Sequence, residues 1–174
     1  MPISGTVAAH MLPLANYPHI DADATLYDVF AMLREKYQAA EQFRSVLVFD
    51  KDRHLVGKIS LHDLLHALLP QYLIHLPARF EGTDDDLAPL ALLWQEDSAK
   101  HCRKMAAQRV GDHVKPVARP LSPTDPMTLA LFQFAVSDFN VIPVAEAGRI
   151  VGVLRIVDVL LTVANTVLAE GKAQ

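Results

Sequence analysis

The chain carries the segment Val46-Leu47-Val48-Phe49, which returns 95 residues later (141 − 46) as Val141-Ile142-Pro143-Val144. Two more pairs keep this separation: Gly57 with Gly152, and Asp63 with Asp158. At the front, Val7–Pro13 returns as Val110–Pro116, at a separation of 103 residues (110 − 7). Similar units pack best about a pseudo-two-fold axis, and the clefts between such halves are natural ligand sites. The sequence therefore predicts two related units with a binding cleft between them.

Composition excludes several classes of protein. With 174 residues, 51% of them hydrophobic, the chain is long enough for a sizeable core and too apolar to be disordered. Its net charge of −4 does not suit a surface that binds nucleic acid or anionic membranes. Cys102 is the only cysteine, which excludes an internal disulfide and fits a reducing compartment. No Lys or Arg precedes Arg34, which argues against a signal peptide, so we expect a cytoplasmic protein.

One apolar stretch, Ile150–Ala169, is about as long as a membrane span. Arg155 and Asp158 lie inside it, and Gly152 interrupts it. A β-branched strand followed by a helix explains the stretch better than a transmembrane segment.

Each unit is expected to have the order β-α-β-β-α, which gives an α/β (α+β) fold. In the first unit the apolar spacing predicts a helix from Thr25, with a Thr25-x-x-Asp28 capping box. Further elements of this unit are strands at Ser45–Phe49 and His54–Ile59 and a helix from Ser60 that stops near Pro70. In the second unit they are strands at Val141–Val144 and Ile150–Leu154 and a helix at Ile156–Leu168. The order is completed by a helix with Asp125 as N-cap and Pro126 as its first residue, and by short strands near Ile20 and Leu121.

The predicted division of the chain is 1–70 for the first unit, 71–109 for an insert and 110–174 for the second unit. The insert contains an acidic loop, Gly82–Asp86, and apolar residues at near-helical spacing: Leu87, Leu90, Trp94, Cys102 and Met105. One or two connecting helices packed on the core account for it. The alternative is a lid or a partner-docking surface, since a long connection is often functional.

The motif Gly57-Lys58-Ile59-Ser60-Leu61-His62-Asp63 follows the last strand of the first unit. With the duplication and the element order, it resembles the CBS (cystathionine β-synthase) domain, which occurs in tandem as a Bateman module. The family signature there is Gly, any residue, an apolar residue, Ser or Thr, two residues, and Asp. The second unit keeps Gly152 and Asp158 but has Arg155 in the hydroxyl position. The family's Pro after the first central strand is present only in the second unit, as Pro143.

The resemblance implies a site for an adenosine compound of the AMP, ADP or ATP type. A helix N-terminus receives phosphate well, so Ser60 is assigned to a phosphate or ribose oxygen, and Asp63 and Asp158 to ribose hydroxyls. The resemblance places the adenine between apolar residues of the first and middle strands. The implied residues are His19, Ile20, Ser45 and Val46 in the first unit, and Pro120, Leu121, Asn140 and Val141 in the second.

Two alternatives stay open for these residues. Ser60-x-x-Asp63 is also a capping box, so Asp63 has a purely structural interpretation. Arg155 is either a phosphate fork or the partner of Asp158, in which case it fills the site. No metal site is expected, because His62 and His66 are one helical turn apart without a third ligand nearby. No catalytic residue is expected either, since the chain has no nucleophile elbow and no phosphate loop.

The function expected from the sequence is a non-catalytic regulatory module that binds an adenine nucleotide and acts through an unidentified protein partner or an oligomeric change. The alternatives are a scaffold protein of the same fold with empty sites, and a small enzyme. The resemblance implies a homodimer formed through helices, and the stripe Val159, Leu160, Val163, Val167 and Leu168 is apolar enough for it. The opposing hypothesis is that the insert, with Leu90 and Trp94, covers this stripe and keeps the chain monomeric.

Overall fold

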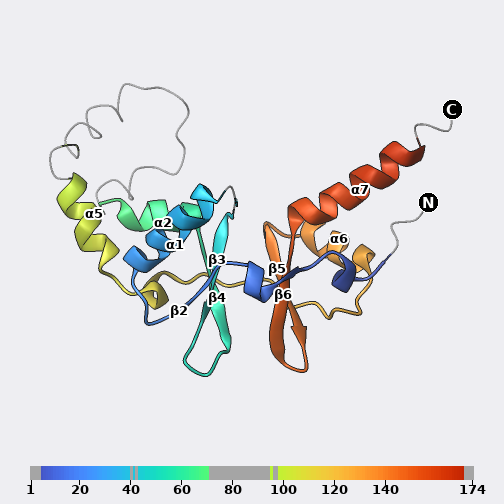
Figure 1. Ribbon diagram of the computed structural model, residues 1–174, viewed down its shortest axis with the longest axis horizontal. Coiled ribbons are helices and arrows are strands. Elements are labelled where there is room, and N and C mark those ends of the chain that lie inside the picture. The colour runs from blue at the N-terminus through green and yellow to red at the C-terminus, as the bar shows by residue number, and fades with distance from the viewer. Residues whose placement is uncertain (1–4, 40, 42, 71–94, 96–97, 171–174) are drawn as a thin grey trace.

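A computed structural model describes residues 5–39, 41, 43–70, 95 and 98–170 (Figure 1). Its strands form two three-stranded sheets. The first has the order β2-β3-β4, and the second has the order β1-β6-β5. The strands are β1 (Leu12–Pro13), β2 (His19–Asp21), β3 (Ser45–Phe49), β4 (Leu55–Ser60), β5 (Val141–Glu146) and β6 (Arg149–Arg155). Strand β2 is parallel to β3, and the remaining pairs of named strands are antiparallel.

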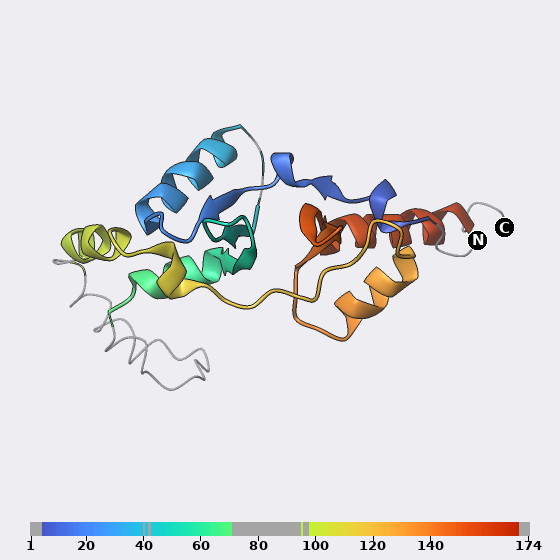
Figure 2. The same ribbon diagram turned by 90° about the horizontal axis from the view of Figure 1, so that it is seen from below.

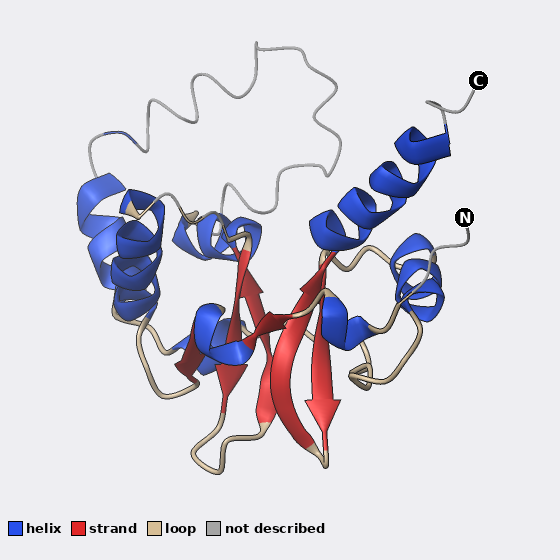
Figure 3. Ribbon diagram, turned by 45° about the vertical axis from the view of Figure 1, so that its right-hand side comes forward, coloured by secondary structure: helices blue, strands red, loops and turns tan. Residues whose placement is uncertain are grey.

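The helices lie on the outer faces of the two sheets, so the sheets face each other in the middle of the molecule (Figures 1 and 3). The described α-helices are α1 (Leu26–Gln38), α2 (Leu61–Leu68), α5 (Ser98–Ala106), α6 (Met127–Ala135) and α7 (Ile156–Glu170). The described part of the chain also has the short 3-10 helices η1 (Val7–Ala9), η2 (Leu14–Asn16) and η3 (Val110–His113). One apolar core lies between each sheet and its helices, and a third lies between the sheets, formed by Tyr17, Phe43, Leu47, Phe49, Val141 and Val153. The predicted fold of two units about a pseudo-two-fold axis is confirmed.

The segments that open the two repeats pack on the opposite units. Val7 is fully buried in the core beside α6 and α7, whereas Val110 is fully buried in the core beside α1 and α2. Strand β1 pairs with β6 through Leu12 and Val153, and Lys115 pairs with Lys58 in the corresponding place. Figure 2 shows the two stretches crossing between the units in opposite directions. This exchange of the two opening segments holds the units together. The predicted boundaries of the insert, at residues 70 and 109, stay predictions.

The exchange explains the two glycines of the repeated motif. A Cβ atom on Gly57 would clash with the Lys115 carbonyl oxygen, and one on Gly152 would lie 2.6 Å from the Leu12 carbonyl oxygen. Both contacts are shorter than real Cβ atoms make. Glycine is therefore required at both positions because the exchanged backbone passes directly over the strand.

Most of the predicted elements are confirmed, and one helix start is wrong. Thr25 and Asp28 form the predicted capping box of α1. Asp125 does not cap α6, since the N-cap is Pro126 and the helix begins at Met127. The Asp125 carboxylate instead accepts from the Ser122 backbone N–H at 2.7 Å. The Met127 N–H donates to the Gly5 carbonyl at 3.1 Å, so the exchanged N-terminal segment satisfies this helix start.

The described part of the insert packs on the first unit. Helix α5, which contains Cys102 and Met105, contacts α1 and α2. Gly82–Asp86, Leu87, Leu90 and Trp94 lie outside the described residues. The stretch Ile150–Ala169 divides into β6 and α7 as expected, and within the described ranges no helix is long and apolar enough to cross a membrane.

Candidate ligand-binding cleft

A cleft opens between the two sheets, at the ends of β3, β5 and β6. It encloses about 420 Å³, including its open mouth. From the first unit it is lined by Tyr17, Phe43, Arg44 and Ser45, and from the second by Asn140, Val141, Arg155, Ile156 and Val157. Both units are therefore needed to form it.

One wall of the cleft is aromatic. The rings of Tyr17 and Phe43 meet edge to face with centroids 5.3 Å apart, and both residues are buried. The Tyr17 hydroxyl lies 2.9 Å from Ser45 Oγ, and burial raises the pKa of Tyr17. At neutral pH this wall therefore combines flat apolar surface with an uncharged hydroxyl pair, which suits a planar, partly polar ligand.

The cleft also contains two guanidinium groups. Arg155 donates from Nε to Asp158 Oδ2 at 2.8 Å and from Nη2 to Asp158 Oδ1 at 2.7 Å. These hydrogen bonds raise the pKa of Arg155. Of the two open interpretations, the structure shows the pairing with Asp158. Because guanidinium has five N–H donors and two are used here, three are left for a further acceptor.

Arg44 differs from Arg155 in its surroundings. Its side chain is exposed at the cleft, and within the described ranges no carboxylate lies at ion-pair distance from it. Helix α7 begins at the same place, with Ile156 and Val157 in the lining. A helix N-terminus carries partial positive charge, so this end of the cleft is electropositive.

The corresponding helix start in the first unit is capped by its own side chains. Ser60 Oγ accepts from the Asp63 N–H at 3.1 Å, and Asp63 Oδ2 accepts from the Ser60 N–H at 2.9 Å and from Ser60 Oγ at 2.6 Å. The capping box is thus confirmed as a structural role. In Asp158 both carboxylate oxygens are bonded to Arg155. The ribose roles of Asp63 and Asp158 stay predictions.

Four of the predicted site residues come together in the cleft: Ser45, Asn140, Val141 and Arg155. Others lie elsewhere in the fold. Ile20 and Val46 pack in the core under α1 and α2, and Leu121 packs in the core under α6. Pro120 lines a groove against α6, and His19 bonds through Nδ1 to the Tyr17 carbonyl at 2.8 Å.

Sequence reasoning missed Tyr17, Phe43 and Arg44. Each comes one or two residues before a strand, Tyr17 before β2 and the other two before β3. Residues at strand starts in one unit meet residues at strand starts in the other, and only the packing of the two units shows this. An aromatic or basic residue just ahead of each predicted strand was the available signal.

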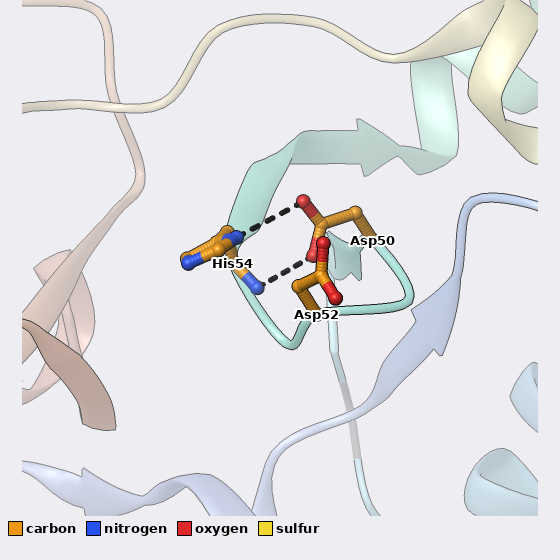
Figure 4. A group of neighbouring side chains, drawn as sticks. All are labelled: Asp50, Asp52 and His54. Carbon is orange, nitrogen blue, oxygen red and sulfur yellow. Dashed lines mark hydrogen bonds and ion pairs between the residues drawn. The ribbon is translucent and has the colours of Figure 1, made fainter.

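The turn between β3 and β4 brings three polar side chains together. Asp50, Asp52 and His54 place their ligand atoms within 4.8 Å of one another (Figure 4). Asp50 accepts from the His54 backbone N–H at 2.8 Å and faces His54 Nδ1 at 3.2 Å. The backbone hydrogen bond lowers the pKa of Asp50. These hydrogen bonds stabilise the turn, and this structural role is sufficient to explain why the three side chains lie together.

Comparison with known proteins agrees with this architecture. The family model of the CBS domain matches residues 8–70. The chain contains a CBS domain. Its two sheets with their outer helices give the whole chain the fold of a CBS pair. No curated protein matches the chain in sequence.

Solved structures of CBS proteins align with the chain over most of its length. A CBS domain-containing protein of unknown function from Kribbella flavida is 14% identical, with a TM-score of 0.70 over 92% of this chain and 98% of that one. CBSX2 in complex with AMP, a CBS-pair protein of Arabidopsis thaliana, is 22% identical, with a TM-score of 0.62 over 92% and 97%. The cytosolic domain of the Mg²⁺ channel MgtE in complex with ATP is 23% identical, with a TM-score of 0.56 over 86% and 45%. At these identities the likeness shows the fold.

Proposed function

We propose that this CBS-domain protein is a non-catalytic regulatory module of the cytoplasm that binds an adenine nucleotide in the cleft between its two units. The observation that carries the proposal is the lining of the cleft, which combines the aromatic pair of Tyr17 and Phe43 with two guanidinium groups, Arg44 from the first unit and Arg155 from the second. Aromatic rings suit a planar base, and guanidinium groups suit phosphate. The AMP and ATP complexes of structurally similar proteins support the same ligand class.

The role of each group follows from its chemistry. Tyr17 and Ser45 offer hydroxyls, and Asn140 offers an amide, at the edge of a base or sugar. Arg44 has no competing carboxylate in the described part of the chain, so it is the first group expected to meet a phosphate. Arg155 contributes its remaining N–H donors while Asp158 keeps it in place.

The proposal predicts that ATP and AMP bind and that adenosine binds at least tenfold more weakly, because adenosine has no anion for the two arginines. Binding of ATP is expected to weaken as salt is added. Calorimetry with the three compounds measures the affinities, and thermal melting gives an independent check, since a ligand of the folded state raises Tm. Equal affinities for adenosine and ATP would exclude phosphate recognition, and no binding of any of them would favour the scaffold hypothesis, in which the Arg155–Asp158 pair fills the site.

We also propose a homodimer formed through the α6–α7 face. The described helix of the insert, α5, packs on α1 and α2 of the first unit. On and beside α6 and α7 of the second unit, eight large apolar side chains among the described residues are more than two-fifths exposed. These are Leu129 and Phe132 on α6, Val136 at the C-cap of α6, and Val157, Leu160, Leu161, Val167 and Leu168 on α7. Helix α6 has no charged residue, and α7 has only Asp158, already paired, and Glu170. An uncharged apolar face of this kind suits an isologous contact with a second copy.

The double variant Phe132→Asp with Leu160→Asp is expected to abolish the dimer, because it places carboxylates in an apolar contact that desolvates them. Tyr27→Asp is the matched control, since Tyr27 is 68% exposed on α1, in the first unit. Sedimentation at micromolar concentration should give twice the 19.2 kDa of one chain for the unmodified protein and the control, and 19.2 kDa for the double variant. A monomeric unmodified protein contradicts the proposal.

A further inference from the structure

A second cleft lies between the two hairpin turns, at the end of the molecule away from the starts of α2 and α7 (Figures 1 and 3). Strand β3 starts at Ser45, in the cleft proposed for the nucleotide, and ends at Phe49, in this one. The space between the turns measures about 1020 Å³, including its open mouth, and residues of both units line it. We call it the hairpin cleft.

The inner lining of the hairpin cleft is apolar. Phe49 is only 2% exposed, and Leu14 and Ile150 are partly buried. All three belong to the core between the sheets. The hairpin cleft therefore reaches that core, and a ligand with an apolar body can bury surface in it.

Two exposed arginines, one from each turn, line the same cleft. The Arg53 guanidinium lies 5.7 Å from the centroid of the Phe49 ring. Within the described ranges, no carboxylate lies at ion-pair distance from Arg53 or Arg149. Both guanidinium groups therefore have N–H donors to offer to an anion.

The charge of the lining indicates how many charges that anion carries. Asp52 is the carboxylate of the lining, and the His54 ring is already hydrogen-bonded to Asp50. Two arginines and one aspartate leave one positive charge (2 − 1). A monoanion such as a carboxylate matches this charge, whereas a phosphate monoester at neutral pH carries close to two negative charges.

The backbone at Arg53 gives an independent reason to assign its side chain a role. Arg53 has a positive φ of 65°, and the position 95 residues later (53 + 95) is Gly148, with a φ of 77°. Glycine is the ordinary residue for this conformation, and an arginine there costs free energy. Ala147, the other described non-glycine residue with positive φ, lines the same cleft. Strained residues of this kind cluster where ligands are held.

We propose that the hairpin cleft binds a small organic carboxylate, with its apolar body against Phe49 and its carboxylate between Arg53 and Arg149. Guanidinium groups bind carboxylates through paired N–H donors. The two arginines come from different units, so the ligand bridges the two turns. The hairpin cleft shares no lining residue with the cleft proposed for the nucleotide, so this site does not depend on the proposed function.

Benzoate is the probe that tests the site, in an NMR titration of the unmodified protein labelled with ¹⁵N. Benzoate is expected to shift the amide signals of Arg53 and Gly148, and benzamide, which has the same shape without the charge, should bind roughly tenfold more weakly or worse. Phenyl phosphate is expected to bind more weakly than benzoate. No shift at the two turns with benzoate, equal binding of benzamide, or tighter binding of phenyl phosphate each overturns the proposal.

Variants of the turns test the residues. Arg53→Gly places in the first unit the residue that the second unit has, and it is expected to weaken benzoate binding roughly tenfold and to melt close to the unmodified protein. Arg149→Met should weaken binding to a similar extent. The control is Lys51→Met, because Lys51 is an exposed lysine of the same turn that lies outside the lining. Asp52→Asn removes the carboxylate of the lining, so benzoate should bind more tightly.

Benzoate binding that is unchanged in both arginine variants overturns the proposal. An Arg53→Gly variant that melts lower and binds benzoate normally overturns it too, because its contact with Phe49 is then structural. If Lys51→Met weakens binding as much as the arginine variants do, the net charge of the turn and not a built site is responsible. If AMP and ATP fail to bind while benzoate binding still depends on Arg53 and Arg149, the proposed function fails and the carboxylate site stands.

Discussion

Gly57→Ala and Gly152→Ala are each expected to lower the free energy of unfolding by about 2–3 kcal/mol, the cost of overpacking a tight contact. The added Cβ would meet a backbone carbonyl of the exchanged segment, Lys115 in one case and Leu12 in the other. Neither backbone moves without breaking the pairing between the units. In a domain of this size such a loss lowers Tm by roughly 5–10 °C, which thermal melting measures.

The control for these variants is Gly148→Asn. Gly148 has a positive φ of 77°, and a Cβ there would meet nothing within 4 Å. Asparagine accepts this conformation more readily than most residues, so the change in Tm should be small. Gly57→Ala and Gly152→Ala variants that melt like the control would show that the exchanged segments do not hold the units together.

Arg155→Met is expected to weaken ATP binding about 10–100-fold and to leave the binding of adenosine nearly unchanged. The substitution removes charge-assisted hydrogen bonds to phosphate, which contribute roughly 1.5–3 kcal/mol each. Arg149→Met is the matched control, because Arg149 lies at the opposite end of the same strand and is exposed. Calorimetry on the three proteins gives the affinities.

The Arg155 variant also leaves Asp158 without its partner, so folding needs a separate check. Arg155→Ser gives α7 the hydroxyl that Ser60 gives α2, and this hydroxyl can cap the helix with Asp158 in place of the ion pair. It should therefore fold normally and show the same selective loss of ATP binding. ATP affinity that is unaffected in both Arg155 variants would assign the Arg155–Asp158 pair to structure alone.

The elements of the fold were predictable because their signals are local. The Thr25–Asp28 and Ser60–Asp63 pairs identify the starts of α1 and α2, and the apolar pattern identifies α7 and the strands. The repeat at 95 residues identifies two units. The predicted N-cap at Asp125 was wrong because a distant backbone group, the Gly5 carbonyl, satisfies that helix start. A contact with a segment so far away in the sequence cannot be predicted from the residues around the helix start.

The site was only partly predictable for the same reason. Ser45, Asn140, Val141 and Arg155 were identified, and they do line one cleft. The sequence left open whether Arg155 meets a phosphate or Asp158, since its spacing to Asp158 permits both. Tyr17, Phe43 and Arg44 were missed, because they line the cleft only through the packing of the first unit against the second. Residues at the junction of two units acquire their surroundings only from the packing.

A crystal structure of the protein grown with saturating AMP tests the central claim most directly. The account predicts the nucleotide in the cleft between the two sheets, with its base or ribose against Tyr17 and its phosphate within hydrogen-bond distance of Arg44 or Arg155. An empty cleft at saturating AMP, with the Arg155–Asp158 pair unchanged, or a nucleotide bound outside this cleft, would contradict it.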